Sequence, residues 1–324
     1  MKHKLNMHSV SSFITGKYFI FVLFILVFAL FAILAPALCT SDSIRNILVN
    51  ASLTAISGCG MTFAITLGGF DLSVGSIMAL STCVIAKLVP VIGIPAAILL
   101  AFVVSAVVGL LNGLIITKLK IQTFVATLAT QVIIKGLALI YTGGLSVSIF
   151  SYTQLKLFSS ARFLGIPLPV LITVVVYLVC QFLYNRCKFG VYLRAAGSNE
   201  KAARLSAVPV ERITICAFII TALTSCLSGV ITVSQVLTAN ASTGGSFALN
   251  AITVVVLGGT SLSGGSGFLG GSVVAAILIS IIENGLTLLG YSDDIQRLVI
   301  GCILIASLTL KTFMSPLSRK EEIA

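Results

Sequence analysis

Residues 95–117 read PAAILLAFVVSAVVGLLNGLIIT and contain no charged side chain. An α-helix needs about 20 mostly apolar residues to cross the hydrocarbon core of a bilayer. The whole chain shares this character, because 58% of its 324 residues are hydrophobic, 9% are charged and the mean hydropathy is +1.15. A soluble domain carries about 25% charged residues to face water. The sequence therefore predicts an all-α integral membrane protein, not a soluble, disordered or collagen-like chain.

Similar apolar stretches recur along the chain and predict about ten transmembrane helices. They lie at residues 18–38, 46–66, 72–92, 95–117, 121–141, 166–185, 213–235, 246–260, 266–289 and 295–312. The first is about 20 residues long, longer than the 7–15 residues of the apolar region of a signal peptide, so we expect an uncleaved span. Residues 1–17 would form an N-terminal tail, 18–312 the membrane domain and 313–324 a C-terminal tail. Residues 186–212 are the most polar internal loop.

The positions of the basic residues predict the orientation. The chain has 20 basic and 9 acidic residues, a net charge of +11. With the N-terminus in the cytoplasm, most Lys and Arg side chains outside the spans fall in cytoplasmic segments, as the positive-inside rule requires. We therefore expect both termini inside, and we attribute the excess positive charge to topology and not to nucleic-acid binding.

A glycine-rich segment occurs twice. Residues 67–76 (LGGFDLSVGS) and 257–266 (LGGTSLSGGS) are alike at seven of ten positions, 190 residues apart. Each copy joins two predicted spans on the cytoplasmic side, and six spans separate the copies. This arrangement is typical of the parallel internal repeats of transporters. A chance likeness between two Gly/Ser-rich turns is the alternative.

The loop over residues 186–212 contains a candidate docking helix. Ser198 can cap a short helix over residues 199–206, in which Ala202 and Ala203 form a small-residue face. A short helix lying on the surface between two spans suits docking into a groove of another protein. The alternative is an ordinary positively charged loop that fixes the topology.

These segments form an ordered set of motifs with a family resemblance. Residues 68–75 (GGFDLSVG), 194–206 (RAAGSNEKAARLS), 257–265 (LGGTSLSGG) and 283–296 together resemble the permease subunits of bacterial ribose/xylose/autoinducer-2-type ABC sugar importers. The resemblance runs in order from about residue 45 to residue 312. One departure is Ala207, where the family commonly has Gly.

The resemblance implies a permease that moves a sugar or sugar-like solute into the cytoplasm, across the bacterial plasma (inner) membrane. Its implied partners are a cytoplasmic ABC ATPase, an extracytoplasmic solute-binding protein and a second permease subunit, identical or related, all within membrane lipid. The segment that matches the loop entering the ATPase groove supplies the implied coupling residues, which are Gly197, Ser198, Asn199, Ala202, Ala203, Leu205 and Ser206.

The sequence itself predicts no catalytic or metal site. A P-loop needs GxxxxGK[ST], but the single Gly-Lys pair, Gly16-Lys17, precedes Tyr18. The two histidines, His3 and His8, both lie in the N-terminal tail, which leaves no Ser/His/Asp triad and no histidine metal cluster. We therefore expect a transport subunit that is not an enzyme, binds no cofactor and relies on ATP hydrolysis by another chain.

Polar residues within membrane spans are candidates for a translocation path. Asp71 is either a gate carboxylate or the N-cap of the third span. The candidate path or gate residues are Asp71, Ser73, Asn112, Gln131, Asn240, Asn250, Ser261, Asn284 and Gln296. Hydrogen bonding between helices is an equally ordinary use for such residues. Lys135 and Glu283 can pair with each other or face water.

Two other functions stay open. An ion-coupled secondary transporter would use Asp71 or Glu283 as its coupling carboxylate and would need no ATPase. An ABC permease for branched-chain amino acids would differ in cargo alone. A membrane enzyme fits least, because no nucleophile or metal constellation is present.

Overall fold

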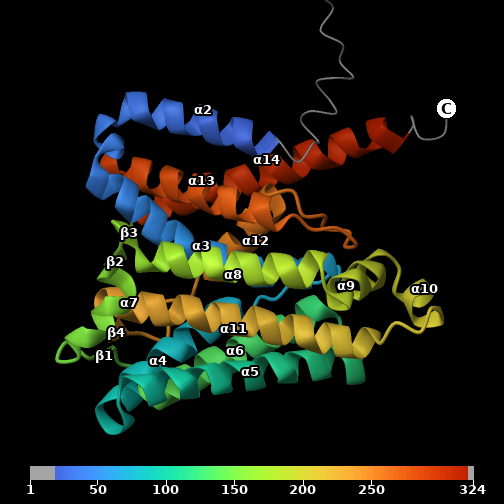
Figure 1. The fold of residues 1–324 in the computed structure, drawn as a ribbon, viewed down its shortest axis with the longest axis horizontal. Helices are drawn as coiled ribbons and strands as arrows, with labels where there is room; N and C mark the ends of the chain where they lie inside the picture. Colours follow the sequence, from blue (N-terminus) through green and yellow to red (C-terminus); the bar gives the residue numbers. More distant parts are fainter. Residues whose placement is uncertain (1–18, 320–324) are drawn as a thin grey trace, which may run out of the picture.

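The computed structural model describes residues 19–319 and shows a bundle of roughly aligned helices (Figure 1). Seven helices in this part of the chain are long and apolar enough to cross a membrane. They are α3 (Ser41–Thr66), α4 (Val74–Ile92), α5 (Ile94–Lys118), α6 (Thr123–Thr142), α8 (Leu168–Asn185), α11 (Val210–Val236) and α13 (Leu269–Leu288).

Three further helices coincide with predicted spans: α2 (Phe19–Leu34), α12 (Phe247–Leu257) and α14 (Asp293–Arg319). With 11 residues, α12 is about 16 Å long at 1.5 Å per residue, half of the hydrocarbon thickness of about 30 Å. The helix is therefore shorter than the span predicted over residues 246–260. The chain is an all-helical membrane protein, but a count of ten crossings and the orientation of the termini stay predictions.

Short elements gather at the two ends of the bundle. One end, here called the cavity end, carries η1 (Pro36–Cys39), η2 (Thr153–Lys156) and α7 (Leu157–Ser160). It also carries two small antiparallel pairs, β1 (Val147–Ser148) with β4 (Thr238–Ala239) and β2 (Arg162–Phe163) with β3 (Ile166–Pro167). The other end, here called the coupling end, carries α9 (Lys188–Ser198) and α10 (Glu200–Leu205), as Figure 1 shows.

Four helices, α3, α4, α11 and α13, form the buried centre, while α5, α6 and α8 expose most of their residues. Small residues let the central helices approach closely, as is common in membranes. A Cβ on Gly113 of α5 would lie 2.7 Å from the Cα of Ile215 on α11, and a Cβ on Gly60 of α3 would lie 2.9 Å from the Cα of Thr221. α11 therefore packs against both α3 and α5 through glycine contacts.

The two copies of the glycine-rich segment end their helices in the same way. Gly68 and Gly259 have φ of +81° and +101°, and the N–H of the residue after each donates back to a carbonyl five residues earlier, at 3.1 and 3.2 Å. These are Schellman caps. The two cap glycines are 191 residues apart, whereas the two copies of the segment align at an offset of 190 residues. The helices that follow begin 195 residues apart, at Val74 and Leu269. The likeness thus covers the helix ends, and a repeat of the whole fold stays a prediction.

Candidate functional site

Three glycine-containing segments meet at the coupling end and form what we call the glycine hub: Thr66–Gly68, Gly197–Ser198 and Gly264–Gly265. The N–H of Gly265 donates to the carbonyl of Thr66 at 2.8 Å. A Cβ on Gly197 would overlap that same carbonyl and lie 2.8 Å from the nitrogen of Gly265. The end of α9 therefore packs directly on the end of α3 and on the loop before α13, with backbone against backbone.

Arg194 anchors α9 to the membrane helices. Its Nη1 donates to the carbonyl of Tyr184 at 2.6 Å, near the C-terminal end of α8, and its guanidinium lies 5.0 Å from the centroid of the Tyr184 ring. A cation there satisfies a helix-end carbonyl and attracts the ring face. Tyr184 in turn packs edge-on against Phe63 of α3. The loop is thus held to α3 and α8 before it reaches the hub.

The N-cap of α10 is Asn199, so the prediction of Ser198 is wrong. Asn199 has an extended backbone, with φ of −158° and ψ of 100°, and its side chain accepts from the N–H of Ala202 at 3.1 Å. Ser198 is still part of α9 and has a helical conformation. Because the chain turns sharply at Asn199, α9 and α10 form a corner.

The two alanines of α10 do not share a face as predicted. Ala203 is buried against Ala196 and Val210, whereas Ala202 is exposed. Leu205 is 91% exposed, although it is a large apolar residue. The free surface of the corner therefore carries Ala202, Leu205 and Ser206. Of the implied coupling residues, Gly197 and Ala203 face into this chain, and Ser198 is exposed but packs its side chain against Gly265 of the hub. Asn199, Ala202, Leu205 and Ser206 are exposed.

Ala207 follows α10 in a left-handed conformation, with φ of +58°. Its N–H donates to the carbonyl of Arg204 at 3.1 Å, and the N–H of Val208 donates to that of Ala203 at 3.0 Å. This is again a Schellman cap, in which Gly is favoured because it has no Cβ. Ala207 therefore departs from the family pattern at a left-handed position, where a Cβ lowers the stability by about 1–2 kcal/mol.

Charged groups tie α10 to α11 and α5. Glu211 binds Lys118 at 2.6 Å and lies 3.9 Å from Arg204, which also pairs with Glu200 at 2.8 Å. The side chains are partly exposed, so solvent screening weakens each of these pairs. They border a groove of about 650 Å³ between α10, α11 and the α5–α6 turn.

A buried polar network lies in the loop between α3 and α4. Oδ1 of Asp71 accepts from the N–H of Ser73 at 2.9 Å and from its hydroxyl, and Nδ2 of Asn112 donates to that hydroxyl at 2.9 Å. Burial raises the pKa of Asp71 to about 6, and the bonds from Ser73 lower it. Asp71 is therefore not the N-cap of α4, as one reading predicted, because it binds Ser73 in the turn before the helix.

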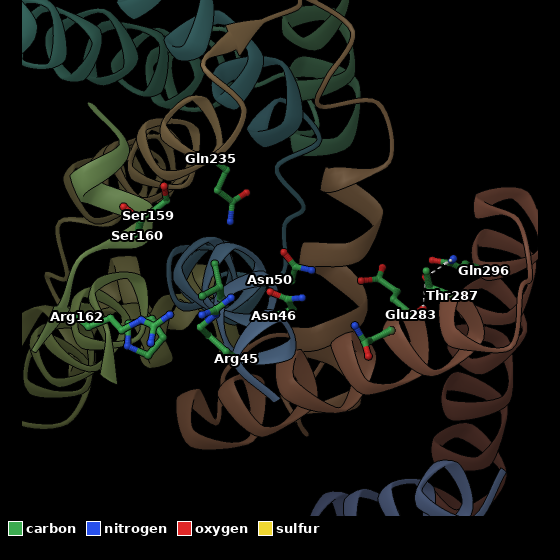
Figure 2. A pocket seen from close by; sticks show the side chains of 13 residues that line it. Arg45, Asn46, Asn50, Ser159, Ser160, Arg162, Gln235, Glu283, Thr287 and Gln296 are labelled. Atoms are coloured by element: carbon green, nitrogen blue, oxygen red, sulfur yellow. Dashed lines mark hydrogen bonds between the residues drawn. The ribbon is translucent and has the colours of Figure 1, made fainter. Parts of the chain in front are cut away.

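A polar cavity of about 640 Å³ opens at the cavity end (Figure 2). It is bounded by the first turns of α3, the end of α11, the α7–β3 segment, the end of α13 and the start of α14. Its lining residues are Arg45, Asn46, Val49, Asn50, Ser159, Ser160, Arg162, Pro167, Gln235, Glu283, Asn284, Thr287 and Gln296. A volume of this size is typical of small-molecule sites.

Three predicted path residues lie in or beside this cavity. Asn284 accepts from the hydroxyl of Ser43 at 2.7 Å, and Nε2 of Gln296 donates to the hydroxyl of Thr287 at 3.0 Å. Asn250 lines a smaller neighbouring cavity of about 250 Å³. Whether these residues contact a passing solute stays a prediction.

The other predicted path residues lie elsewhere. Asp71, Ser73 and Asn112 form the buried network at the coupling end, and Ser261 forms a turn in the loop before α13. Asn240 donates to Ser146 at 2.9 Å beside the β1–β4 pair, and Gln131 is half-buried on α6. They lie outside the polar cavity.

Lys135 and Glu283 do not pair with each other, which was one of the two alternatives for them. Lys135 is exposed on α6, at the outside of the bundle, whereas Glu283 faces the polar cavity and accepts from Asn250 at 3.4 Å. Sequence reasoning also missed Asn46 and Asn50. Their i, i+4 spacing puts two amides on one face of α3, and that signal could have found them.

Comparisons with known proteins show the family of this chain. Residues 43–308 match the family described as branched-chain amino acid transport system / permease component. The ribose import permease protein RbsC of Bacillus subtilis is 39% identical over 89% of this chain and 90% of its own length. The D-allose transport system permease protein AlsC of Escherichia coli is 33% identical over 92% of both chains.

The L-arabinose transport system permease protein AraH of Escherichia coli is 34% identical over 95% of both chains. No solved structure matches significantly. With seven apolar helices and relatives that are permeases over nearly their whole length, the chain is a multi-pass inner-membrane protein. The chain belongs to the permease family of ABC importers.

Proposed function

We propose that this chain is the membrane subunit of an importer that brings a neutral sugar into the cytoplasm, with ATP hydrolysed by a separate subunit. The observation that carries this proposal is the set of relatives. Permeases named for ribose, allose and arabinose each align with about nine-tenths of this chain at 33–39% identity. The shared cargo class of those three proteins is a small neutral sugar.

The polar cavity supports a sugar over a branched-chain amino acid. Among its 13 lining residues, Val49 and Pro167 are the two apolar ones, and amides, hydroxyls and charged groups make up the rest. An aliphatic side chain gains its binding free energy from apolar surface, whereas a polyhydroxylated ring needs hydrogen-bond partners. The family description names amino acids, but most of the residues that line this chain's cavity are polar or charged.

The coupling end supports docking of an ATPase on the α9–α10 corner. The exposed side of α10 presents small residues and Leu205 to a partner, while Gly197 seats the same corner on α3 and on the loop before α13. α3 runs from Thr66 at the hub to Asn46 at the cavity, and α13 runs from the hub loop to Glu283. A displacement of the corner would therefore reach the cavity through two rigid helices.

The remaining partners follow from the same assignment. A solute-binding protein would deliver the sugar at the cavity end, and a second permease subunit would complete the path. We propose that this chain binds no cofactor of its own. This arrangement also predicts that the isolated chain moves no sugar.

The test is uptake of radiolabelled D-ribose, D-allose and L-arabinose by the native host after deletion of this gene, with and without the gene restored. We expect at least one uptake to fall to background on deletion and to return on complementation. Unchanged uptake of all three would contradict the sugar assignment. Uptake by the purified chain alone, driven by a proton or sodium gradient, would support the ion-coupled alternative instead.

A further inference from the structure

Glu283 is a half-buried carboxylate of α13 at the cavity end of the bundle. It lies five residues before the end of α13 at Leu288, and the preceding residues Ile281 and Ile282 are buried in the core. It lines both the polar cavity and the smaller cavity beside it, so it forms part of the wall between them. An ionisable group within a membrane helix is costly and is typically kept for a function.

No cation in the described part of the chain neutralises Glu283. The basic residues that share its two cavities are Arg45, Arg162 and Arg297, and none of them lies within ion-pair distance of it. Arg45 pairs instead with Asp42 at 3.4 Å. Among residues 19–319, the one hydrogen bond to the carboxylate comes from Asn250 and is long at 3.4 Å. A structural ion pair therefore does not account for Glu283.

The groups opposite Glu283 are amides with free hydrogen-bonding capacity. Figure 2 shows Asn46 and Asn50 of α3 pointing across the cavity toward the Glu283 carboxylate, with Gln235 of α11 directed into the same space. Asn46 and Asn50 are exposed to the cavity and have no protein partner in the described chain. The carboxylate supplies hydrogen-bond acceptors to the cavity, and the amides supply both donors and acceptors.

We infer that the polar cavity is a solute-binding subsite of this chain, in which Glu283 is the specificity-determining group for a neutral polyhydroxylated solute. This inference rests on the proposed function. Each sugar hydroxyl is at once a donor and an acceptor. The Glu283 carboxylate accepts from hydroxyls, and the Asn46 and Asn50 amides donate to them. A solute that lacks the hydroxyl facing Glu283 leaves that carboxylate unpaired, and such sites reject analogues more strongly than apolar pockets do.

The test is direct sugar binding to the full-length chain in lipid nanodiscs, without a binding protein, measured by saturation-transfer difference NMR. The probes are D-ribose, D-allose, L-arabinose and 2-deoxy-D-ribose. The variants are Glu283→Ala, Glu283→Gln and Asn50→Ala. Asp294→Asn is the matched control, because it also exchanges a carboxylate for an amide at the cavity end but lies on the exposed start of α14, outside both cavities.

We expect saturable binding of at least one of the three sugars to the native chain. We expect Glu283→Ala to bind the sugar about tenfold more weakly, because it loses a hydrogen bond to a charged group. Glu283→Gln keeps one acceptor and should lose less, while Asp294→Asn should match the native chain. The ratio of the affinities for D-ribose and 2-deoxy-D-ribose should move toward one in Glu283→Ala, which a merely structural role would not produce. If Glu283→Ala does not reach the membrane, Asn50→Ala must show the weakened binding.

Two results separate the failure of this inference from that of the proposed function. If host cells import the sugar but the native chain shows no saturable binding, or if the Glu283 variants keep the native affinity and ratio, the subsite is wrong and the importer assignment stands. If complemented cells import none of the three sugars, the proposed function fails, and the subsite fails with it.

Discussion

The two ends of this molecule are built on opposite principles. At the coupling end, the glycine hub brings backbone atoms of three segments into contact, and an added Cβ at Gly197 or Gly265 would collide with a neighbour. At the cavity end, polar side chains line about 640 Å³ and make few hydrogen bonds with one another. The difference teaches that coupling a movement between segments requires closely packed backbone contacts. Passage of a solute instead requires hydrogen-bonding side chains that can exchange partners.

The largest expected effect comes from filling the hub. Gly197→Leu should reduce uptake to background, because overpacking a close contact costs about 1–3 kcal/mol and here separates α9 from α3. Gly136→Leu is the matched control, since Gly136 on α6 has open space around it. Radiolabelled uptake and the amount of chain in the membrane check the result. Full uptake by Gly197→Leu at normal abundance would show that the hub does not transmit anything.

The second prediction concerns Leu205 on the exposed surface of the α9–α10 corner. Leu205→Asp should abolish co-purification of the ATPase, because a charge replaces an apolar contact, while the thermal stability of the chain changes by no more than about 0.5 kcal/mol. Leu164→Asp, at an equally exposed residue of the cavity end (88% against 91%), should leave ATPase association intact. Retention of the ATPase by Leu205→Asp would move the docking surface away from α10.

Asp71 sharpens the comparison through pH. Its raised pKa means that the folded chain favours the protonated form, so its contribution to stability is present below the ordinary pKa of about 3.9 and is lost as pH rises through about 6. The native chain should therefore lose about 1 kcal/mol more stability between about pH 5 and pH 8 than Asp71→Asn, which carries a neutral amide. Thermal unfolding in detergent measures this, and equal pH dependence of the two chains would refute it.

The smallest effect concerns the turn after α10. Ala207→Gly removes a Cβ from a left-handed residue and should stabilise the chain by about 1 kcal/mol. Because the change touches the corner and not the cavity, sugar affinity at the cavity end should stay the same. A lower melting temperature for Ala207→Gly would contradict the assignment of this turn.

The sequence predicted the membrane class and most helix positions, because long apolar runs carry that signal directly. It placed the end of α12 too late, because the helix of 11 residues stops at Leu257, before Gly258 and Gly259. The ends of helices were also hard to place, since Ser198 and Asn199 are both favoured caps and only the backbone turn at Asn199 distinguishes them.

The two parts of the candidate site differed in how far the sequence revealed them. The coupling motif stood out as a contiguous polar segment, but its division into an inward face at Gly197 and an outward face at Leu205 depends on tertiary packing. The cavity joins α3, α11 and α13, which are far apart in the chain. Asn284 and Gln296 could be predicted as cavity residues because they are polar residues in apolar stretches. The contact of Glu283 with Asn250 could not be predicted, because it depends on which helices are neighbours.

The most direct test of the central claim is sugar transport into proteoliposomes that contain the chain with and without its co-purified ATPase, with the solute-binding protein and sugar supplied on the side opposite the ATPase. The account predicts transport that requires both the ATPase and ATP, is lost in Gly197→Leu, and is indifferent to proton and sodium gradients. Transport by the chain alone, driven by an ion gradient, would contradict it.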